Sequence, residues 1–507
     1  MITDKPMTGQ EYLESLNDGR EVWIYGERVK NITQHPAFRN SARMIARVYD
    51  AMHDPKTRDI ITAPTENGGR THRYFLAPKT VEDQVASRDS IAETQRVTYG
   101  WMGRSPDYKG SFLATLGANA AFYRGYEENA KRWYRKAQER TAYINHAIMN
   151  PPVDRNKSSA DSSDVYIRVV KENDAGIFVS GAKVVATNSA LTNYTFVAHA
   201  GQIPIKDPAY APVFIVPTNA PGVKMISRMS NEHRAAVLGS PFDYPLSSRM
   251  DENDAILVMD NVFVPWEDVF MHGDVDQAND FAPKSGFNAR AAMHGCTRLA
   301  VKLDFITGLM VKALEITGTH TFHGVMSRMG EVIAWRNTMW GLSDAMAKSN
   351  IPWNGMVQPD PRFGTAYRTI SQIAYPAIKN IIEASVTSGL IYLNSHANDF
   401  LNPELRPYLD TYMRGSGGAD AEERVKVMKL LWDTIGTEFG GRSELYEINY
   451  LGSNDLTRLQ NYWEALSLGE MDRMKGLVET CMSEYDLNGW TVPDLVNNDD
   501  VSILKAR

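Results

Sequence analysis

The chain is poor in cysteine, in long apolar runs and in positive charge. Its 507 residues include two cysteines, Cys296 and Cys481, which lie far apart. This excludes a Cys-x-x-Cys metal site and a disulfide framework. No apolar run approaches the roughly 18–20 residues that span a bilayer, and residues 1–6 lack the apolar core of a signal peptide. The net charge of −7 shows no excess of positive charge of the kind that binds nucleic acid or anionic membranes. We therefore expect a cytoplasmic globular protein.

Phosphate-binding and zinc-binding motifs are also missing. Residues 414–420, Arg-Gly-Ser-Gly-Gly-Ala-Asp, resemble a dinucleotide fingerprint but follow no β-rich run, so we interpret them as a loop between helices. The chain has neither a Gly-Lys-Ser/Thr phosphate loop nor a His-Glu-x-x-His helix. His320 and His323 lie between Gly318 and Gly324, which indicates a surface turn and no metal site. Any NAD(P)H would have to be used by another protein.

The sequence pattern changes twice, from helical to β-rich and back to helical. Residues 8–17 and the Glu-, Lys-, Arg- and Ala-rich residues 126–143 predict helices, with a strand at 21–25. Short β-rich runs then recur, which predicts a barrel or sandwich of about 120 residues and not βαβ units. These runs are residues 165–170, 177–186, 194–198, 213–217, 223–227 and 255–258 with 262–265.

The last part of the chain predicts a helical bundle. Apolar residues recur at alternating spacings of three and four, which places them on one face of a helix. The first such stripe is Leu299, Leu303, Ile306, Met310 and Ala313, and the second is Val425, Met428, Trp432, Ile435 and Phe439. Gly440-Gly441 is expected to end the second helix. The predicted fold class is α+β, divided into a helical domain (1–143), a β domain (144–279), a helical bundle (280–480) and an arm (481–507).

One candidate site lies where the first helical region meets the β region. Residues 145–155 carry His146 and a Pro-Pro pair, which forbids helix and places His146 near a helix end beside a β region. Arg104 and Tyr108 are four residues apart and share a face if their segment is helical or turn-like. This trio could hold and polarise a phenolic or carboxylate oxygen. The alternatives are a structural histidine and an Arg and Tyr at a surface turn.

Several longer motifs resemble one known family. The Gly-Arg-Ser-Pro-Asp-Tyr run around Arg104 and the Asn-His-Ala run around His146 are similar to the large oxygenase component of the 4-hydroxyphenylacetate 3-monooxygenase family. Further similar segments are residues 181–192, 239–249, 260–266 and 439–450. The resemblance covers nearly the whole chain. It implies an acyl-CoA-dehydrogenase-like fold, with a flavin between the β domain and the bundle.

The resemblance also implies a reaction and a set of site residues. The family uses reduced FAD from a separate NAD(P)H:flavin reductase, together with O2. It forms a flavin C4a-hydroperoxide and hydroxylates a para-substituted phenol at the ortho position, giving a catechol. Arg104, Tyr108 and His146 would contact the phenolic oxygen, and the family suggests a homotetramer. The flavin would contact His146, Ala147, Ile148, Pro152, Val153, Asp154, Arg155, Thr187, Gly452, Ser453 and Asn454, and the substrate tail would contact His199, Gln202 and Ile203.

Other activities and several substrates stay open. An acyl-CoA-type dehydrogenase would need a carboxylate base and a slot for the CoA tail, and a related dehydratase would need thiol ligands for an iron–sulfur cluster. The substrate could be 4-hydroxyphenylacetate, tyrosine, 4-coumarate or another phenol. Residues 199–205 contain no Arg or Lys, so we expect the enzyme to accept neutral para substituents as well as phenylacetate.

Overall fold

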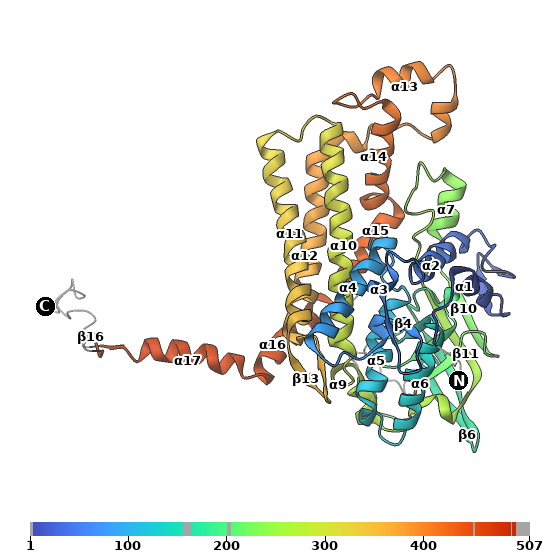
Figure 1. Ribbon diagram of the computed structural model, residues 1–507, viewed down its shortest axis with the longest axis vertical. Coiled ribbons are helices and arrows are strands. Elements are labelled where there is room, and N and C mark those ends of the chain that lie inside the picture. Colours follow the sequence, from blue (N-terminus) through green and yellow to red (C-terminus); the bar gives the residue numbers. More distant parts are fainter. Residues whose placement is uncertain are drawn as a thin grey trace.

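The chain folds into two helical regions that flank a pair of β-sheets (Figure 1). The computed structural model describes residues 4–154, 156, 164–199, 204–449, 452–487 and 489–492. Three of the predicted site residues, Arg155, Gln202 and Ile203, lie outside these ranges, as does most of the tail after Trp490.

The strands of the β region form two sheets. The six-stranded sheet has the order β2-β1-β10-β11-β7-β6, and the four-stranded sheet has the order β12-β9-β8-β5. The strands are β1 (Glu21–Ile24), β2 (Glu27–Arg28), β5 (Ile144–Ala147), β6 (Arg168–Asn173), β7 (Gly176–Lys183), β8 (Tyr194–Val197), β9 (Val213–Pro217), β10 (Val223–Ser227), β11 (Ala255–Pro265) and β12 (Val269–Met271).

Most of these pairings are antiparallel, with two exceptions that bring in distant segments. β1 pairs with β10 in parallel, so the N-terminal region contributes a strand to the larger sheet. β5 pairs in parallel with β8 and places His146 opposite Phe196. His146 therefore lies within a strand, further into the β region than the end of a helix.

The sequence predicts two short β runs, at 255–258 and 262–265, where the structure has the single strand β11. It is one strand whose register against β7 shifts between Met259 and Val262. Asn261 has a φ of 52° there, a left-handed conformation that Asn tolerates better than most residues. A bulge of this kind bends a strand without ending it.

The helices of the first 140 residues cover the sheets and one face of the bundle (Figure 1). Thr8 caps the first helix through a reciprocal capping box with Glu11. The predicted helix at 126–143 spans 127–140 and ends at Thr141, whose φ is 51°. The elements are α1 (Gly9–Ser15), α2 (Arg39–Ala51), α3 (Arg58–Ile61), β3 (Thr62–Pro64), β4 (Arg70–His72), α4 (Val81–Val97), α5 (Gly110–Ala118) and α6 (Glu127–Arg140).

Long helices of the C-terminal region stand side by side (Figure 1). The first predicted stripe lies entirely in α10, and all five of its residues are buried, which confirms it as core. The long helices are α10 (Phe287–Ile316), α11 (His323–Lys348) and α12 (Pro361–Val386). Shorter elements are α7 (Asn231–Leu238), α8 (Val275–Asn279), α9 (Phe281–Lys284), β13 (Ile351–Trp353), β14 (Met356–Gln358), α13 (Arg406–Tyr412), α14 (Ala421–Ile435) and α15 (Glu438–Asn449).

The predicted end of the second stripe is wrong. Its helix, α14, ends at Ile435, and Gly440-Gly441 lies inside the next helix, α15. The chain turns at Gly436, where any Cβ would fall about 2.2 Å from the Trp432 ring, so that position needs glycine. Trp432 itself is 41% exposed. The last member of the stripe, Phe439, belongs to α15 and is buried there.

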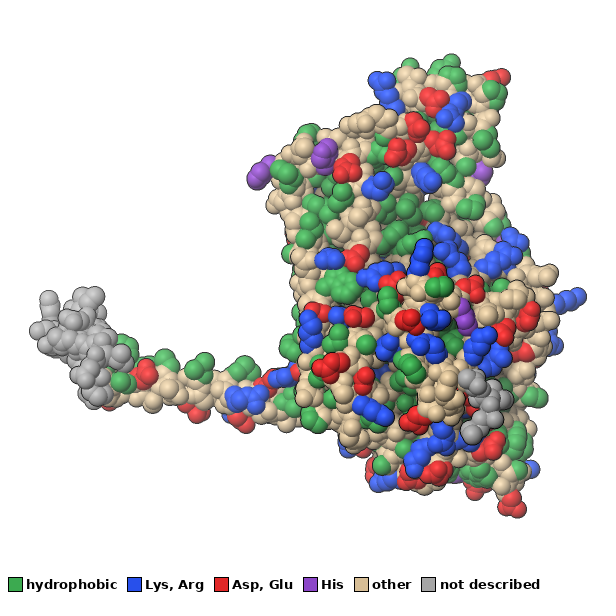
Figure 2. Space-filling view, in the orientation of Figure 1, with side chains coloured by type: hydrophobic (Ala, Val, Ile, Leu, Met, Phe, Trp, Pro, Cys, Tyr) green, Lys and Arg blue, Asp and Glu red, His purple; other side chains and the backbone are tan. Residues whose placement is uncertain are grey.

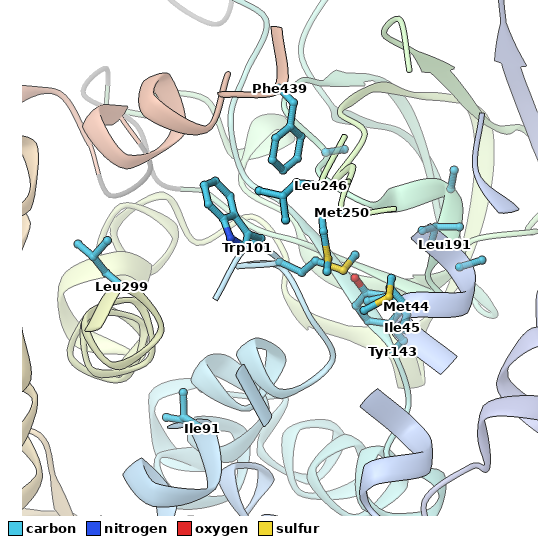
Figure 3. Close-up of a cluster of buried hydrophobic side chains, with 14 of the residues drawn as sticks. Met44, Ile45, Ile91, Trp101, Tyr143, Leu191, Leu246, Met250, Leu299 and Phe439 are labelled. Carbon is cyan, nitrogen blue, oxygen red and sulfur yellow. The ribbon is translucent and has the colours of Figure 1, made fainter. Parts of the chain in front are cut away.

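One apolar core joins the three regions. Figure 3 shows the Trp101 indole near Leu246 and Phe439, with Leu299 on the helix to one side and Tyr143 further along the same cluster. These side chains come from the loop after α4, the β region, helices α10 and α15, and the residue directly before β5. Core packing of Trp101 therefore holds the chain in place just before the turn that carries Arg104.

Helix α16 (Asn454–Ser467) packs on one side against α12 and leads into α17 (Glu470–Met482), and the two form an arm whose α17 part projects from the body. β15 (Tyr485–Asp486) and β16 (Gly489–Trp490) follow (Figure 1). No described side chain of α17 is buried. Figure 2 shows apolar side chains along this arm. They include Leu459, Tyr462, Trp463, Leu466, Met474, Leu477, Val478 and Met482. Within the described part of the chain, no helix is long and apolar enough to cross a membrane.

Candidate active site

Arg104 and Tyr108 meet in the turn between α4 and α5. Tyr108 lies in a short 3-10 helix, Asp107–Lys109, and the Arg104 guanidinium carbon is 4.5 Å from the centre of its ring. Both side chains are buried. An arginine over an aromatic face is a cation–π contact, and it gives the pair a fixed mutual position. The surface-turn alternative for these two residues is thereby excluded.

The backbone of Arg104 is held from two directions. Its N–H donates to Glu252 Oε1 at 2.6 Å, and its carbonyl accepts a hydrogen bond from the Tyr143 hydroxyl at 2.5 Å. Glu252 also accepts from the Gly103 N–H at 2.9 Å. Burial raises the pKa of Glu252 to about 7, against the lowering effect of these donors and of the Arg104 charge. A carboxyl group of the β region and a tyrosine directly before β5 thus position an arginine of the helical region.

His146 reaches the same place from β5. Its ring centre lies 5.4 Å from that of Tyr108 and 6.2 Å from that of Phe112. Burial, and then the positive charges of Lys109 and Arg104, lower the pKa of His146 well below its usual value. The structure therefore brings the predicted trio together, and it favours a neutral imidazole.

Lys109 is a site residue that the sequence did not single out. It is fully buried, and its Nζ lies 3.4 Å from His146 Nδ1. Nζ also lies 5.1 Å from the centre of the Tyr108 ring and 5.9 Å from that of Tyr143. Burial, followed by the Arg104 charge, lowers the pKa of Lys109 well below its usual value. Only its position directly after Tyr108 could have drawn attention to it.

Asp107 and His294 form a second buried pair, which contacts Tyr108. His294, on α10, bonds through Nε2 to Asp107 Oδ2 at 2.8 Å, and Ser105 and Gln95 also donate to this carboxylate. Burial alone would raise the pKa of Asp107, but His294 holds it well below its usual value. The His294 ring meets the Tyr108 ring edge-on at 5.1 Å. The bundle thus contributes a second aromatic contact, besides the Arg104 guanidinium, that holds the Tyr108 ring in place.

The predicted flavin-contacting segments of the β region also lie together. Met149 and Val184 form an isolated β-bridge, in which the Val184 N–H donates to the Met149 carbonyl at 2.9 Å. Next to it, Val185 is 59% exposed with a φ of 54°, a strained conformation for a β-branched residue. Thr187 donates to Asp254 Oδ1 at 2.6 Å.

This bridge joins the 146–154 segment to the 184–187 segment. Ala147 is buried and Ile148 partly buried, whereas Pro152 and Val153 are exposed and Asp154 is partly exposed. Exposed apolar side chains beside strained backbone and a threonine fit a planar ring system that would cover them.

Gly452, Ser453 and Asn454 lie elsewhere, at the start of α16. Gln372, on α12, donates to the Gly452 carbonyl at 3.0 Å, which holds this turn against the bundle. Gly452 has a φ of 119°. Its predicted role toward a flavin stays a prediction.

The predicted substrate-tail segment begins beside a second buried lysine. His199 is buried and bonds through Nε2 to the Pro212 carbonyl at 3.0 Å. Lys183 donates to Asn150 Oδ1 at 2.8 Å, and burial lowers its pKa to about 7. Burial and then the Lys183 charge lower the pKa of His199 well below its usual value. A lysine therefore lies near His199, the first residue of a segment whose sequence has no Arg or Lys.

Among the residues that the structure describes, no group of three or more His, Cys, Asp or Glu side chains is placed to hold a metal ion. Cys296 is buried and Cys481 is exposed, and both are free thiols.

Comparison with known proteins decides the family. Residues 8–271 match the family described as 4-hydroxyphenylacetate 3-hydroxylase N terminal, and residues 278–479 match its C-terminal counterpart. The chain belongs to the 4-hydroxyphenylacetate 3-hydroxylase family. The resemblance in the sequence motifs is thereby confirmed.

Several relatives of this hydroxylase family member match along almost their whole length. The oxygenase component of a 4-nitrophenol 2-monooxygenase from Rhodococcus sp is 56% identical over 99% of this chain and 97% of its own. The oxygenase component of the Escherichia coli 4-hydroxyphenylacetate 3-monooxygenase is 54% identical, with the same coverage.

Solved structures confirm the predicted fold. The oxygenase component of a 4-hydroxyphenylacetate 3-monooxygenase, complexed with FAD and 4-hydroxyphenylacetate, superposes with a TM-score of 0.87. It is 31% identical and covers 94% of this chain and 99% of its own. A 4-hydroxybutyryl-CoA dehydratase from N. maritimus shares the fold, with a TM-score of 0.84 at 20% identity.

Proposed function

We propose that this hydroxylase family member is the oxygenase of a two-component system that converts a para-substituted phenol to a catechol. The observation that carries the proposal is the meeting of Arg104, Tyr108 and His146 in one buried place, beside an apolar surface suited to a flavin ring. Reduced FAD and O2 would supply the electrophilic oxygen. The protein has to bind the phenol as its phenolate, because a phenolate carries more electron density at the ortho carbon.

The three side chains suit a phenolate. The Arg104 guanidinium supplies a permanent positive charge, and the Tyr108 hydroxyl can donate a hydrogen bond to the phenolic oxygen. His146 contributes a ring nitrogen from β5, with its ring centre 5.4 Å from that of Tyr108. Burial strengthens each of these interactions because it excludes water from around the charges.

The electrons would come from a separate NAD(P)H:flavin reductase. The support is the missing dinucleotide motif, and the names of the relatives as oxygenase components. We expect NADH, FAD and this chain alone to give no catechol, and an added flavin reductase or chemically reduced FAD to start its formation. Arg104→Ala is the matched control, which should consume reduced FAD without forming catechol. Rapid NADH oxidation by the pure chain would contradict the proposal.

Substrate choice is proposed to include neutral as well as anionic para substituents. Residues 199–205 carry no cation, and the nearby Lys183 has a pKa of about 7, so it supplies only part of a charge at neutral pH. The measurement is kcat/KM for 4-hydroxyphenylacetate and for tyrosol, in the wild type and in Lys183→Met. A preference for the acid that exceeds about 10³-fold would contradict the proposal, because it would show that a fully charged side chain binds the carboxylate of the para substituent.

We infer that the enzyme works in the cytoplasm, where NAD(P)H is available to its reductase, and as a homotetramer. The support for association is the arm formed by α16 and α17, which carries exposed apolar side chains away from the body (Figure 2). A further copy of the chain would cover this surface. Light scattering on the pure protein measures the oligomeric state directly.

A further inference from the structure

Lys109 contacts His146, and the function proposed above for Arg104, Tyr108 and His146 gives this contact no role. The Lys109 Nζ lies against His146 Nδ1, so Nε2 is the ring nitrogen left for a substrate oxygen. Other ionisable groups also surround Lys109. They are Arg104, Asp107 and Tyr108 on its own segment, Tyr143 directly before β5, and Glu252 of the β region. Lys109 is thus buried among aromatic rings with the imidazole as its hydrogen-bonding neighbour.

The charges of this cluster oppose a simple general-base role for His146. A histidine that kept the phenol's proton would become a buried imidazolium close to the Arg104 guanidinium, and burial and the neighbouring cationic side chains disfavour that form. Burying two neighbouring positive charges is costly. The proton nevertheless has to leave the phenol, so it needs an acceptor other than the imidazole.

Lys109 has the properties of that acceptor. Burial and the Arg104 charge favour its neutral amine while the site holds no anion. A neutral amine has a lone pair and can accept a hydrogen bond from an imidazole Nδ1–H. When a phenolate forms nearby, its negative charge favours the ammonium form of the same side chain.

We propose that Lys109 takes up the phenol's proton through His146, an inference that rests on the proposed hydroxylase function. In the starting state, His146 carries its hydrogen on Nδ1 and donates it to the Lys109 amine. The phenol O–H bond breaks as a bond from that hydrogen to Nε2 forms. The Nδ1–H bond then breaks as a new N–H bond forms on Lys109.

The step leaves the protons and charges balanced. The products are a phenolate, a neutral imidazole with its hydrogen on Nε2, and an ammonium group on Lys109. His146 then donates from Nε2 to the phenolate oxygen, beside Arg104 and Tyr108. No proton enters the solvent. Lys109 acts through His146 and does not touch the substrate.

The competing explanation is that Lys109 is a packing residue held by the two tyrosine rings. A packing role predicts that its replacement lowers stability or substrate affinity without changing where the phenol's proton goes. A count of protons released on phenol binding therefore separates the two explanations.

The experiment uses 4-nitrophenol, whose phenolate absorbs visible light, at a pH at which the free phenol is protonated. Absorbance reports phenolate formation on the protein, and an indicator dye in weakly buffered solution reports released protons. Both are measured without flavin and, under anaerobic conditions, with reduced FAD. We expect the wild type to bind phenolate while releasing almost no proton.

Three variants test the role of each atom. Lys109→Met removes the acceptor and should bind the phenol in its neutral form. Lys109→Arg keeps a positive charge without a lone pair and should bind phenolate with release of one proton for each phenolate formed. His146→Gln keeps an N–H donor near the Nε2 position but cannot transfer a proton, so any phenolate that it binds should also be accompanied by proton release.

The rate of hydroxylation gives an independent readout. Lys109→Met should form catechol about 10²–10⁴-fold more slowly at neutral pH. Its rate should recover at alkaline pH, where the phenol ionises in solution, whereas a packing defect would not be repaired by hydroxide. Thermal unfolding shows whether each variant is folded, and His146→Gln provides the test if Lys109→Met is not.

Two results would overturn the inference. One is a wild type that releases one proton for each phenolate bound, and the other is a folded Lys109→Met that binds phenolate with the wild-type proton count. Failure of the proposed function looks different, because the wild type would then bind no phenol and form no catechol with any reductase.

Discussion

Two buried lysines, Lys109 and Lys302, show how differently this fold treats the same side chain. Lys302, on α10, lies 2.9 Å from Glu447, which also binds Arg298 at 2.6 Å. Burial lowers the pKa of Lys302 to about 8, and Glu447 limits the decrease. Lys109 has an imidazole where Lys302 has a carboxylate, and its pKa falls well below the usual range.

The difference separates a structural cation from one suited to proton transfer. Burial alone would raise the pKa of Glu447, but Arg298 and Lys302 bring it down to about 2, so this cluster stays ionised. Its charges are balanced inside the protein. In the proposed mechanism, the Lys109 cluster instead gains a negative charge only when a phenolate binds.

The largest expected effect is on catalysis at the Lys109 cluster. Arg104→Ala, Tyr108→Phe and His146→Ala should each lower catechol formation, by about 10²–10⁴-fold where a positioned charge or proton carrier is lost. Peroxide release should rise, since reduced FAD then reacts with O2 without an activated phenol. Catechol yield and peroxide are measured with a generic reductase. Near wild-type coupling in all three variants would remove the trio from the mechanism.

The next effect is on stability and concerns the Lys302 cluster. Lys302→Met leaves Glu447 buried with one cation fewer, so the unfolding free energy should fall by about 3 kcal/mol. Lys109→Met removes no ion pair and should cost less than about 1.5 kcal/mol. Denaturant unfolding of both variants measures the difference. Equal losses would mean that the two lysines have the same role.

A smaller effect should appear in the pH dependence of stability. Glu252 has a folded pKa of about 7 against an ordinary value of 4.5, so folding takes up a proton between these values. Its contribution is complete below about pH 4.5 and is lost as the pH rises through about 7. Glu252→Gln should make that decline shallower, measured as the unfolding free energy across this window. The buried Glu232, whose pKa is also about 7, should preserve part of the decline.

The smallest effect concerns the aromatic ring that contacts an arginine of each cluster. The Tyr446 ring lies between them, 5.6 Å from the Arg104 guanidinium carbon and 5.4 Å from that of Arg298. Tyr446→Leu should lower stability by about 0.5–2 kcal/mol through lost cation–π contacts, and Tyr446→Phe, which keeps the ring, should cost less. If the two variants lose equal stability, the ring contacts contribute nothing measurable.

Most of the fold could be predicted because its signals are local. The α10 stripe and the strands at 213–217 and 223–227 follow from periodicity and β propensity. The break at Gly436 could not, because the need for glycine there arises from the Trp432 ring packing over the chain. The entry of β1 into the larger sheet is a pairing across some 200 residues, which no local pattern encodes.

The candidate site divides in the same way. Arg104, Tyr108 and His146 stand in motifs that single them out, and the structure brings them together. Lys109, Glu252 and His294 carry ordinary residue types at ordinary spacings. Their significance comes from burial and from one or two contacts each, such as the bond from His294 to Asp107. Burial of this kind arises when distant segments pack together, so the sequence of one segment does not predict it.

The arm of α16 and α17 has a consequence for measurement. If a further copy of the chain covers its apolar side chains, association contributes to the stability of each subunit by mass action. The midpoint of thermal unfolding should then rise with protein concentration, and enzyme diluted to nanomolar levels for an assay should lose activity over time. Leu477, which is 76% exposed on α17, is the position at which to test this. Leu477→Glu should reproduce at high concentration the behaviour that the wild type shows on dilution.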